Sequence, residues 1–210
     1  TMKDLFRDGL SFSATLFVVY VVEYGLCALL VGRALGPGEV AVFQVLMSLT
    51  TAYVGLLTMV GTPLWAALVD ARARSDHDWM VSTTRRYYRY LFFLAGPAFA
   101  GMAILGPLIL PLWYGDEFQA GHALFAAHGL FLVAIGWRHV NRILLIGLDR
   151  LTESVRPILL GLLAGVILGV AGLHLFGLPG LFAGLSIGAL VIPGIQLPRQ
   201  VWRDLAAMDS

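Results

Sequence analysis

The sequence predicts an all-α polytopic membrane protein, a single six-transmembrane-helix bundle that takes in residues 1–210. Composition is the first reason: hydrophobic residues make up 59% of the chain and charged residues 13%, whereas a typical soluble domain has about 25% charged residues. The second reason is that six apolar stretches each reach the roughly 20 residues that a bilayer crossing needs. The mean hydropathy of +0.82 agrees, and little chain remains for a soluble catalytic domain.

The six expected spans follow one another with short connections. They are residues 10–32, 39–69, 90–112, 119–148, 155–175 and 178–196. The first is too long for a signal-peptide core and has no A-x-A cleavage pattern, so we expect a retained span. Gly36-Pro37-Gly38 breaks the chain after it, and Leu178-Pro179-Gly180 predicts a tight turn between the last two spans.

The second span is longer than a bilayer requires. A continuous helix over 39–69 would extend roughly 46 Å at about 1.5 Å per residue, so it either projects from the membrane or kinks at Pro63. Between Asp78 and Tyr90, arginines alternate with aromatic residues. We interpret this segment as an interfacial belt, with rings at headgroup level and arginines on anionic lipid, rather than as a nucleic-acid surface.

Basic residues predict the topology. They gather before the first span, between spans two and three, between spans four and five, and after the last span. The loops on the opposite side contain a single arginine or lysine, Arg33. The positive-inside rule then places both termini in the cytoplasm.

The last two spans carry small residues at helical spacing. The glycines recur at i, i+4 and i+8 in both: Gly161, Gly165 and Gly169, and Gly180, Gly184 and Gly188. Such faces let two backbones approach closely in lipid. We expect them to pack against each other or against neighbouring helices, as support rather than as a substrate path.

The most informative polar cluster interrupts the fourth span. Arg138, His139, Asn141 and Arg142 are followed by a renewed apolar run, and charges at membrane depth usually face a protein interior or a hydrated path. Arg138 and Arg142 share a helix face one turn apart, an arrangement suited to clamping phosphate between two guanidinium forks. His139 and Asn141 are candidate auxiliary donors. Snorkelling to the headgroups is the alternative, stronger for Arg142 than for the deeper Arg138.

Two further polar patterns lie in the first two spans. Tyr20, Glu23, Tyr24 and Cys27 recur at helical spacing, with Glu23 near mid-span. Glu23 either exchanges a proton during a transport cycle or forms a structural ion pair, for instance with a span-four arginine. The second span has a polar stripe, which lines either a helix contact or a hydrated cavity. Its members are Gln44, Ser48, Thr51, Gly55, Thr58 and Thr62.

No pattern of an enzyme or a metal site is present in the sequence. Walker, G-x-S-x-G and H-E-x-x-H motifs are all lacking, and we interpret Asp76-His77-Asp78 as a solvated loop. His122, His128 and His174 have no metal-ligand spacing. Cys27 is interpreted as a buried apolar residue. We therefore expect no catalysis, no cofactor, no metal and no nucleic-acid partner.

Several stretches resemble a known family. Residues 34–43, the Gly61-Thr62-Pro63-Leu64-Trp65-Ala66-Ala67 helix end, and the run from Arg85 through Leu112-Trp113-Tyr114-Gly115-Asp116-Glu117-Phe118 are similar to polysaccharide flippases. The chain resembles the C-terminal half of an O-antigen or lipopolysaccharide-type flippase. That group belongs to the multidrug/oligosaccharidyl-lipid/polysaccharide exporter superfamily.

The resemblance implies one lobe of a two-lobed exporter. Such a transporter moves an undecaprenyl-pyrophosphate-linked oligosaccharide across the bacterial inner membrane by alternating access. It needs a second lobe, either a missing N-terminal lobe or a second copy. On this interpretation Glu23 couples transport to protons, or the membrane potential drives it. The substrate-binding candidates are Arg138, Arg142, His139, Asn141, Gln44, Thr51 and Tyr20.

Three alternatives stay open. A lobe of a cation-coupled multidrug exporter would favour acidic cavities, which only Glu23 supports. A membrane enzyme acting on polyprenyl phosphates would need paired carboxylates or a nucleophile near the interface, and none stands out. A non-transporting scaffold would use the glycine faces for assembly.

Overall fold

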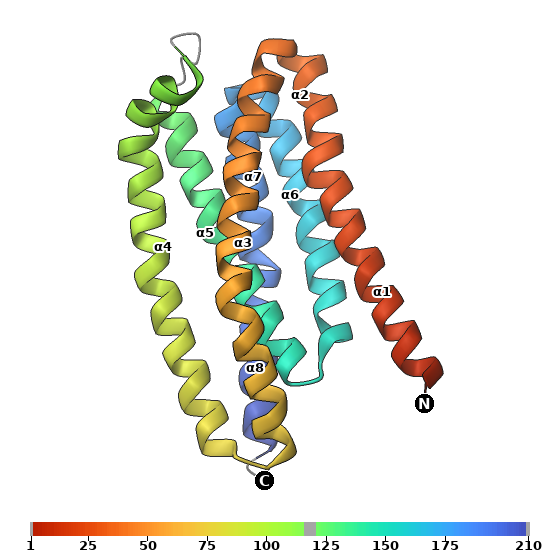
Figure 1. The fold of residues 1–210 in the computed structure, drawn as a ribbon. Helices are drawn as coiled ribbons and strands as arrows, with labels where there is room; N and C mark the ends of the chain where they lie inside the picture. The colour runs from red at the N-terminus through yellow and green to blue at the C-terminus, as the bar shows by residue number, and fades with distance from the viewer. Residues whose placement is uncertain (1, 116–120, 209–210) are drawn as a thin grey trace.

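The computed structural model describes residues 2–115 and 121–208, which are almost entirely helical and contain no strand. Within these residues, six helices are long and apolar enough to cross a membrane. The predicted fold class is therefore confirmed, and the chain is a multi-pass membrane protein. The helices run up and down as a bundle, and both termini lie at the same end of it (Figure 1).

Several of the six spans are built from more than one helical segment. The first span combines α1 (Met2–Tyr20), a π-helix η1 (Val21–Leu26) and α2 (Cys27–Leu35). Then follow α3 (Pro37–Ala73), α4 (His77–Tyr114) and α5 (His122–Gly147). The fifth span is the 3-10 turn η2 (Leu151–Ser154) with α6 (Val155–Phe176), and the sixth is α7 (Leu178–Val191) with α8 (Pro193–Ala207).

The helices extend beyond the expected span boundaries at two places. α4 begins at His77, well before residue 90, because the Asp76 carboxylate caps it by accepting the Trp79 N–H at 3.2 Å. Hydropathy detects only the part of a helix that lies in lipid. The segment from Asp78 to Tyr90, interpreted above as an interfacial belt, is therefore the first part of α4. The second span, expected to project or to kink at Pro63, is a single helix from Pro37 to Ala73. The sixth span restarts at Pro193 and continues to Ala207. The expected start of the fourth span, residue 119, lies outside the described residues.

Glycines permit the two sharp turns that the sequence predicts. Gly36 adopts φ 95° between α2 and α3, and Gly177 adopts φ 68° between α6 and α7. L residues with a side chain rarely adopt these conformations. The turns therefore set neighbouring spans antiparallel with almost no intervening loop.

The glycine faces of α6 and α7 pack against each other, as predicted. A Cβ added at Gly184 would overlap the backbone of Gly169, and one at Gly188 would overlap that of Gly165. Gly172 and Gly180 approach each other in the same way. Side chains are thus excluded from this seam, and the two backbones are in direct contact.

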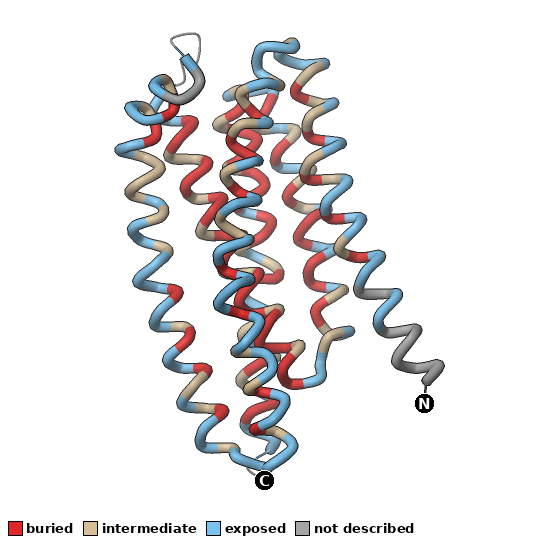
Figure 2. The backbone as a smooth tube through the Cα atoms, in the orientation of Figure 1, coloured by how far each residue is buried: buried red, intermediate tan, exposed pale blue. Residues whose placement is uncertain are grey.

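α5 is the central helix and α4 is peripheral. The buried share of the most apolar window is 61% for α5 and 11% for α4, and Figure 2 shows the same contrast. Two apolar clusters fill the interior. One contains Phe43, Phe131 and Phe182, and the other contains Leu68 and Leu144. The polar residues of α5 fall where these clusters meet, so the fold holds them at mid-bundle.

Candidate functional site

A cleft of about 250 Å³ opens between the first span, α3 and α5. Glu23, Arg138, His139 and Arg142 line its polar part, and apolar residues such as Leu16 line the rest. The N-terminal part of α1 leans away from α3, so the two helices diverge toward the end that holds the termini (Figure 1). All residues that line the cleft belong to helices long and apolar enough to cross a membrane, so the cleft lies within the membrane-spanning part of the bundle.

Glu23 and Arg138 form a bidentate ion pair across the cleft. Arg138 Nη1 donates to Glu23 Oε1 at 2.7 Å, and Nη2 donates to Oε2 at 3.0 Å. Their side chains are only 8% and 11% exposed, respectively. The planar guanidinium fork matches both carboxylate oxygens. The ion-pair alternative for Glu23 is therefore the arrangement that this structure adopts, and it joins spans one and four.

The π-helix sets the position of Glu23. Val21–Leu26 forms a six-residue π segment in the middle of the first span, and such segments are frequent at functional sites because they displace the residues that follow. Glu23 lies within it and is buried. The regular helical spacing of Tyr20, Glu23 and Tyr24 gave no sign of this interruption.

Arg142 and His139 belong to a hydrogen-bonded chain that reaches α3. Arg142 Nη2 lies 3.2 Å from His139 Nδ1, and His139 Nε2 lies 3.2 Å from Thr58 Oγ1. Because a guanidinium can only donate, Nδ1 accepts and the ring proton resides on Nε2. Thr58 Oγ1 accepts that proton and donates its own to the carbonyl of Val54 at 2.8 Å. The chain is consistent at every step with a neutral His139.

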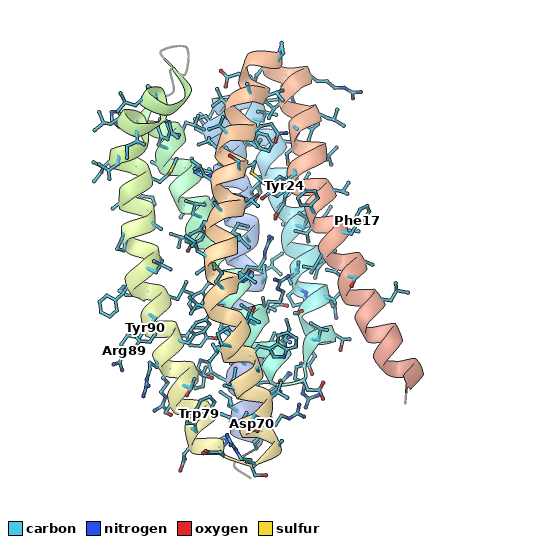
Figure 3. The ribbon with its side chains drawn as sticks, viewed as in Figure 1. Phe17, Tyr24, Asp70, Trp79, Arg89 and Tyr90 are labelled. Atoms are coloured by element: carbon cyan, nitrogen blue, oxygen red, sulfur yellow. The ribbon has the colours of Figure 1, made fainter. Side chains whose placement is uncertain are left out.

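Tyr24 and Tyr20 form the upper aromatic side of the cleft. Their rings stack with centroids 4.6 Å apart. The Tyr24 hydroxyl lies 2.8 Å from Thr51 Oγ1, which donates to the Met47 carbonyl at 3.0 Å. Figure 3 shows Tyr24 in the space between the first span and α3. Tyr20 and Thr51, which the sequence analysis named as substrate-binding candidates, thus both line the cleft.

Asn141 and Gln44 lie outside the cleft, contrary to prediction. Asn141 is fully buried. It donates to the Trp137 carbonyl at 2.8 Å and accepts from the Tyr88 hydroxyl of α4 at 2.5 Å. The reason is geometric. At about 100° per residue, the His139 side chain is rotated from Arg138 in one direction around the helix axis and the Asn141 side chain in the other. Gln44 is exposed on α3, two turns from Thr51, and does not line the cleft.

The polar stripe of α3 is not buried against another helix of this bundle. All of its members are exposed, namely Gln44, Ser48, Thr51, Gly55, Thr58 and Thr62. The four hydroxyl groups donate to carbonyls three or four residues earlier in α3. Of the stripe, Thr51 lines the cleft and Thr58 lies 3.2 Å from His139 of the cleft, so the exposed polar face of α3 reaches the cleft at these two residues.

Sequence reasoning missed several contacts around the site. Tyr24 and Thr58 were seen only as members of a pattern, yet they bond Thr51 and His139. His128, expected to have no role, is fully buried beside the Phe182 ring, with Nε2 2.9 Å from the hydroxyl of the cleft residue Thr50. No group of three potential metal ligands occurs among the described residues.

A comparison with protein-family models decides the broad identity. The model described as "Polysaccharide biosynthesis protein" matches residues 1–121, more than half of the chain. This chain belongs to the polysaccharide biosynthesis protein family. The matched region includes Tyr20, Glu23, Gln44 and Thr51 and ends just before α5. Comparisons with curated proteins and with solved structures found no match.

Proposed function

We propose that this member of the polysaccharide biosynthesis protein family is the C-terminal lobe of a flippase. It would translocate undecaprenyl-pyrophosphate-linked oligosaccharide across the bacterial inner membrane by alternating access, with both termini in the cytoplasm. One observation carries the proposal: Arg138 and Arg142 lie one turn apart in a cleft at membrane depth, bordered by hydroxyl groups. Such a site suits an anionic headgroup that carries sugars.

The chemistry of the cleft supports a pyrophosphate ligand. Guanidinium groups offer paired N–H donors to phosphate oxygens, and the low dielectric of the membrane strengthens each contact. The hydroxyls of Tyr24, Thr51 and Thr58 offer neutral partners for sugar hydroxyls. Apolar residues such as Leu16 and Val19 complete the lining, while the polyprenyl tail stays in lipid.

Glu23 supplies a means of energy coupling within this proposal. In this structure its carboxylate neutralises Arg138, which avoids an unpaired buried charge. A bound pyrophosphate would compete for that guanidinium, and a Glu23 left without it would be stabilised by taking up a proton. The membrane potential alternatively favours outward movement of an anion by about 2.3 kcal/mol per charge per 100 mV.

A second lobe is part of the proposal. The cleft encloses only about 250 Å³, far less than a lipid-linked oligosaccharide occupies, and its polar border on α3 is open. An N-terminal lobe or a second copy of this chain would close a larger cavity against that border. No catalytic step and no cofactor are invoked.

The test is charge removal at Arg142 in the complete transporter. Arg142→Gln should lower O-antigen display and flipping in proteoliposomes by roughly tenfold, because a charge-assisted bond to the substrate is lost. Arg74→Gln is the control, since Arg74 is an exposed arginine paired with Asp70 outside the cleft. Unchanged flipping by Arg142→Gln would contradict the clamp. Drug resistance would favour the multidrug exporter. Chemical modification of the lipid without leaflet exchange would favour the membrane enzyme, and assembly without transport would favour the scaffold.

A further inference from the structure

Seven arginines at the end of the bundle that holds the termini fall into two groups, and Arg156 and Arg199 at the same end are exposed without a carboxylate partner among the described residues. Four of them form ion pairs: Arg72 with Asp149 at 3.3 Å, Arg74 with Asp70 at 2.9 Å, Arg150 with Glu153 at 3.2 Å, and Arg203 with Glu153 at 2.9 Å. Arg85, Arg86 and Arg89 of α4 are exposed and pair with no carboxylate in the described part of the chain. The second group is therefore available to an external anion.

Arg85 is held in place by an aromatic stack. Its guanidinium carbon lies 5.9 Å from the centre of the Trp202 ring of α8, a cation–π distance. Trp202 in turn lies 6.1 Å from the Tyr88 ring, and Tyr88 lies 5.2 Å from Trp137. A guanidinium stacked on a ring keeps its in-plane N–H donors. Arg85 is thus positioned with its hydrogen-bonding edge uncommitted.

The three arginines lie at the edge of the membrane. Arg89 is the last charged residue before an uncharged stretch from Tyr90 to Gly115. Tyr90 is 63% exposed and Trp79 is 37% exposed, as expected of rings at headgroup level. Figure 3 shows Arg89 and Tyr90 on the side of α4 that points away from the other helices. This face of α4 is therefore turned toward lipid.

Apolar side chains continue the same surface into the membrane. Phe92 and Phe93 follow Arg89 by three and four residues and are 78% and 67% exposed. Residues at this spacing lie one above another on a helix. The surface thus presents guanidinium groups at headgroup depth and aromatic rings directly below, which matches a phosphate with attached acyl chains better than a soluble anion.

We propose that Arg85, Arg86 and Arg89 form a binding site for the phosphate of an anionic phospholipid on the outer face of α4. Arg85 and Arg89 lie one turn apart, so their forks can approach one phosphate group together. Phe92 and Phe93 contact the acyl chains. The site is separate from the cleft and does not depend on the transported substrate.

The test measures lipid retention by the purified full chain. Wild-type protein in mixed phosphatidylglycerol and phosphatidylcholine should retain phosphatidylglycerol preferentially in native mass spectrometry. The double variant Arg85→Gln/Arg89→Gln should lower that preference by roughly tenfold, since each basic residue near an anionic surface contributes measurably. Arg74→Gln, at the same end, and Arg33→Gln, at the opposite end, should retain the wild-type preference.

Three results would overturn the proposal. One is a wild-type protein with no preference for phosphatidylglycerol, a measurement that needs no variant to fold. Another is equal loss of preference in Arg74→Gln and in the double variant, with helicity preserved in both. The third is displacement of phosphatidylglycerol by inorganic phosphate, which would identify a soluble-anion site.

Discussion

Glu23 and Arg138 illustrate how two costly charges become tolerable inside a membrane protein. Each would be strongly destabilised alone at this depth, yet their bidentate contact satisfies both carboxylate oxygens. Removing one partner leaves the other charge buried without compensation. The pair therefore stabilises the contact between spans one and four, and it also keeps the cleft polar.

A double-mutant cycle should reveal this coupling. Glu23→Gln and Arg138→Gln are each expected to destabilise the protein by about 3 kcal/mol, because each leaves a buried charge unpaired. The double variant should be less destabilised than the sum of the two. Reversible unfolding in detergent measures all three, and strictly additive losses would argue against a coupled pair.

Asn141 is expected to act in folding rather than in ligand binding. Tyr88→Phe removes the hydroxyl that donates to Asn141 Oδ1 and leaves a buried acceptor unsatisfied, at a loss of about 1–3 kcal/mol. Pyrophosphate binding at the cleft should be unaffected. Tyr90→Phe is the matched control, because Tyr90 is 63% exposed. Unfolding experiments measure stability, and titration measures pyrophosphate affinity. Weaker pyrophosphate binding at unchanged stability would instead indicate that Asn141 belongs to the substrate site.

At the scale of elements, α6 and α7 form the firmest support of the bundle. Their glycines bring the backbones into contact along most of both helices. In lipid, such close packing replaces the hydrophobic driving force that is missing between helices. α5 packs against α7 and carries the charged residues. The rigid seam thus stands behind the cleft, while the first span and α3 border its opening.

Alanine substitutions should distinguish seam glycines from exposed ones. Gly184→Ala and Gly188→Ala are expected to destabilise by about 2 kcal/mol or more, since the added methyl groups overlap backbone that cannot move independently. Gly101→Ala in α4 meets nothing within 4 Å and should be neutral or stabilising because alanine favours helix. Thermal unfolding in detergent measures the three, and equal effects would contradict the seam.

At the scale of the whole molecule, two kinds of exposed surface occur. Beyond Arg89 the outer face of α4 is apolar, as Phe92 and Leu112 show at 78% and 87% exposure. The exposed face of α3 carries the polar stripe instead, and the cleft lies between α3, the first span and α5. A lipid-facing surface is expected to be apolar, so the polar side is the one that we expect to face water or a second lobe.

Cysteine labelling should separate these two surfaces. Thr58→Cys is expected to react with an aqueous maleimide in membranes, whereas Phe92→Cys should react only with a lipid-soluble reagent. The single native cysteine, Cys27, is fully buried and should give little background. Equal protection of both positions from the aqueous reagent would contradict a hydrated cleft.

The amino-acid sequence by itself determined the number of spans, the glycine seam and the residue types of the cleft. These follow from hydropathy and helical period, which are local properties. Tertiary structure alone decided that Glu23 faces Arg138 and that Asn141 turns to Tyr88 of α4. Which side chains meet depends on the packing of helices that are distant in the sequence. A π segment, or a helix that extends beyond its hydrophobic stretch, cannot be recognised from a regular spacing of apolar residues.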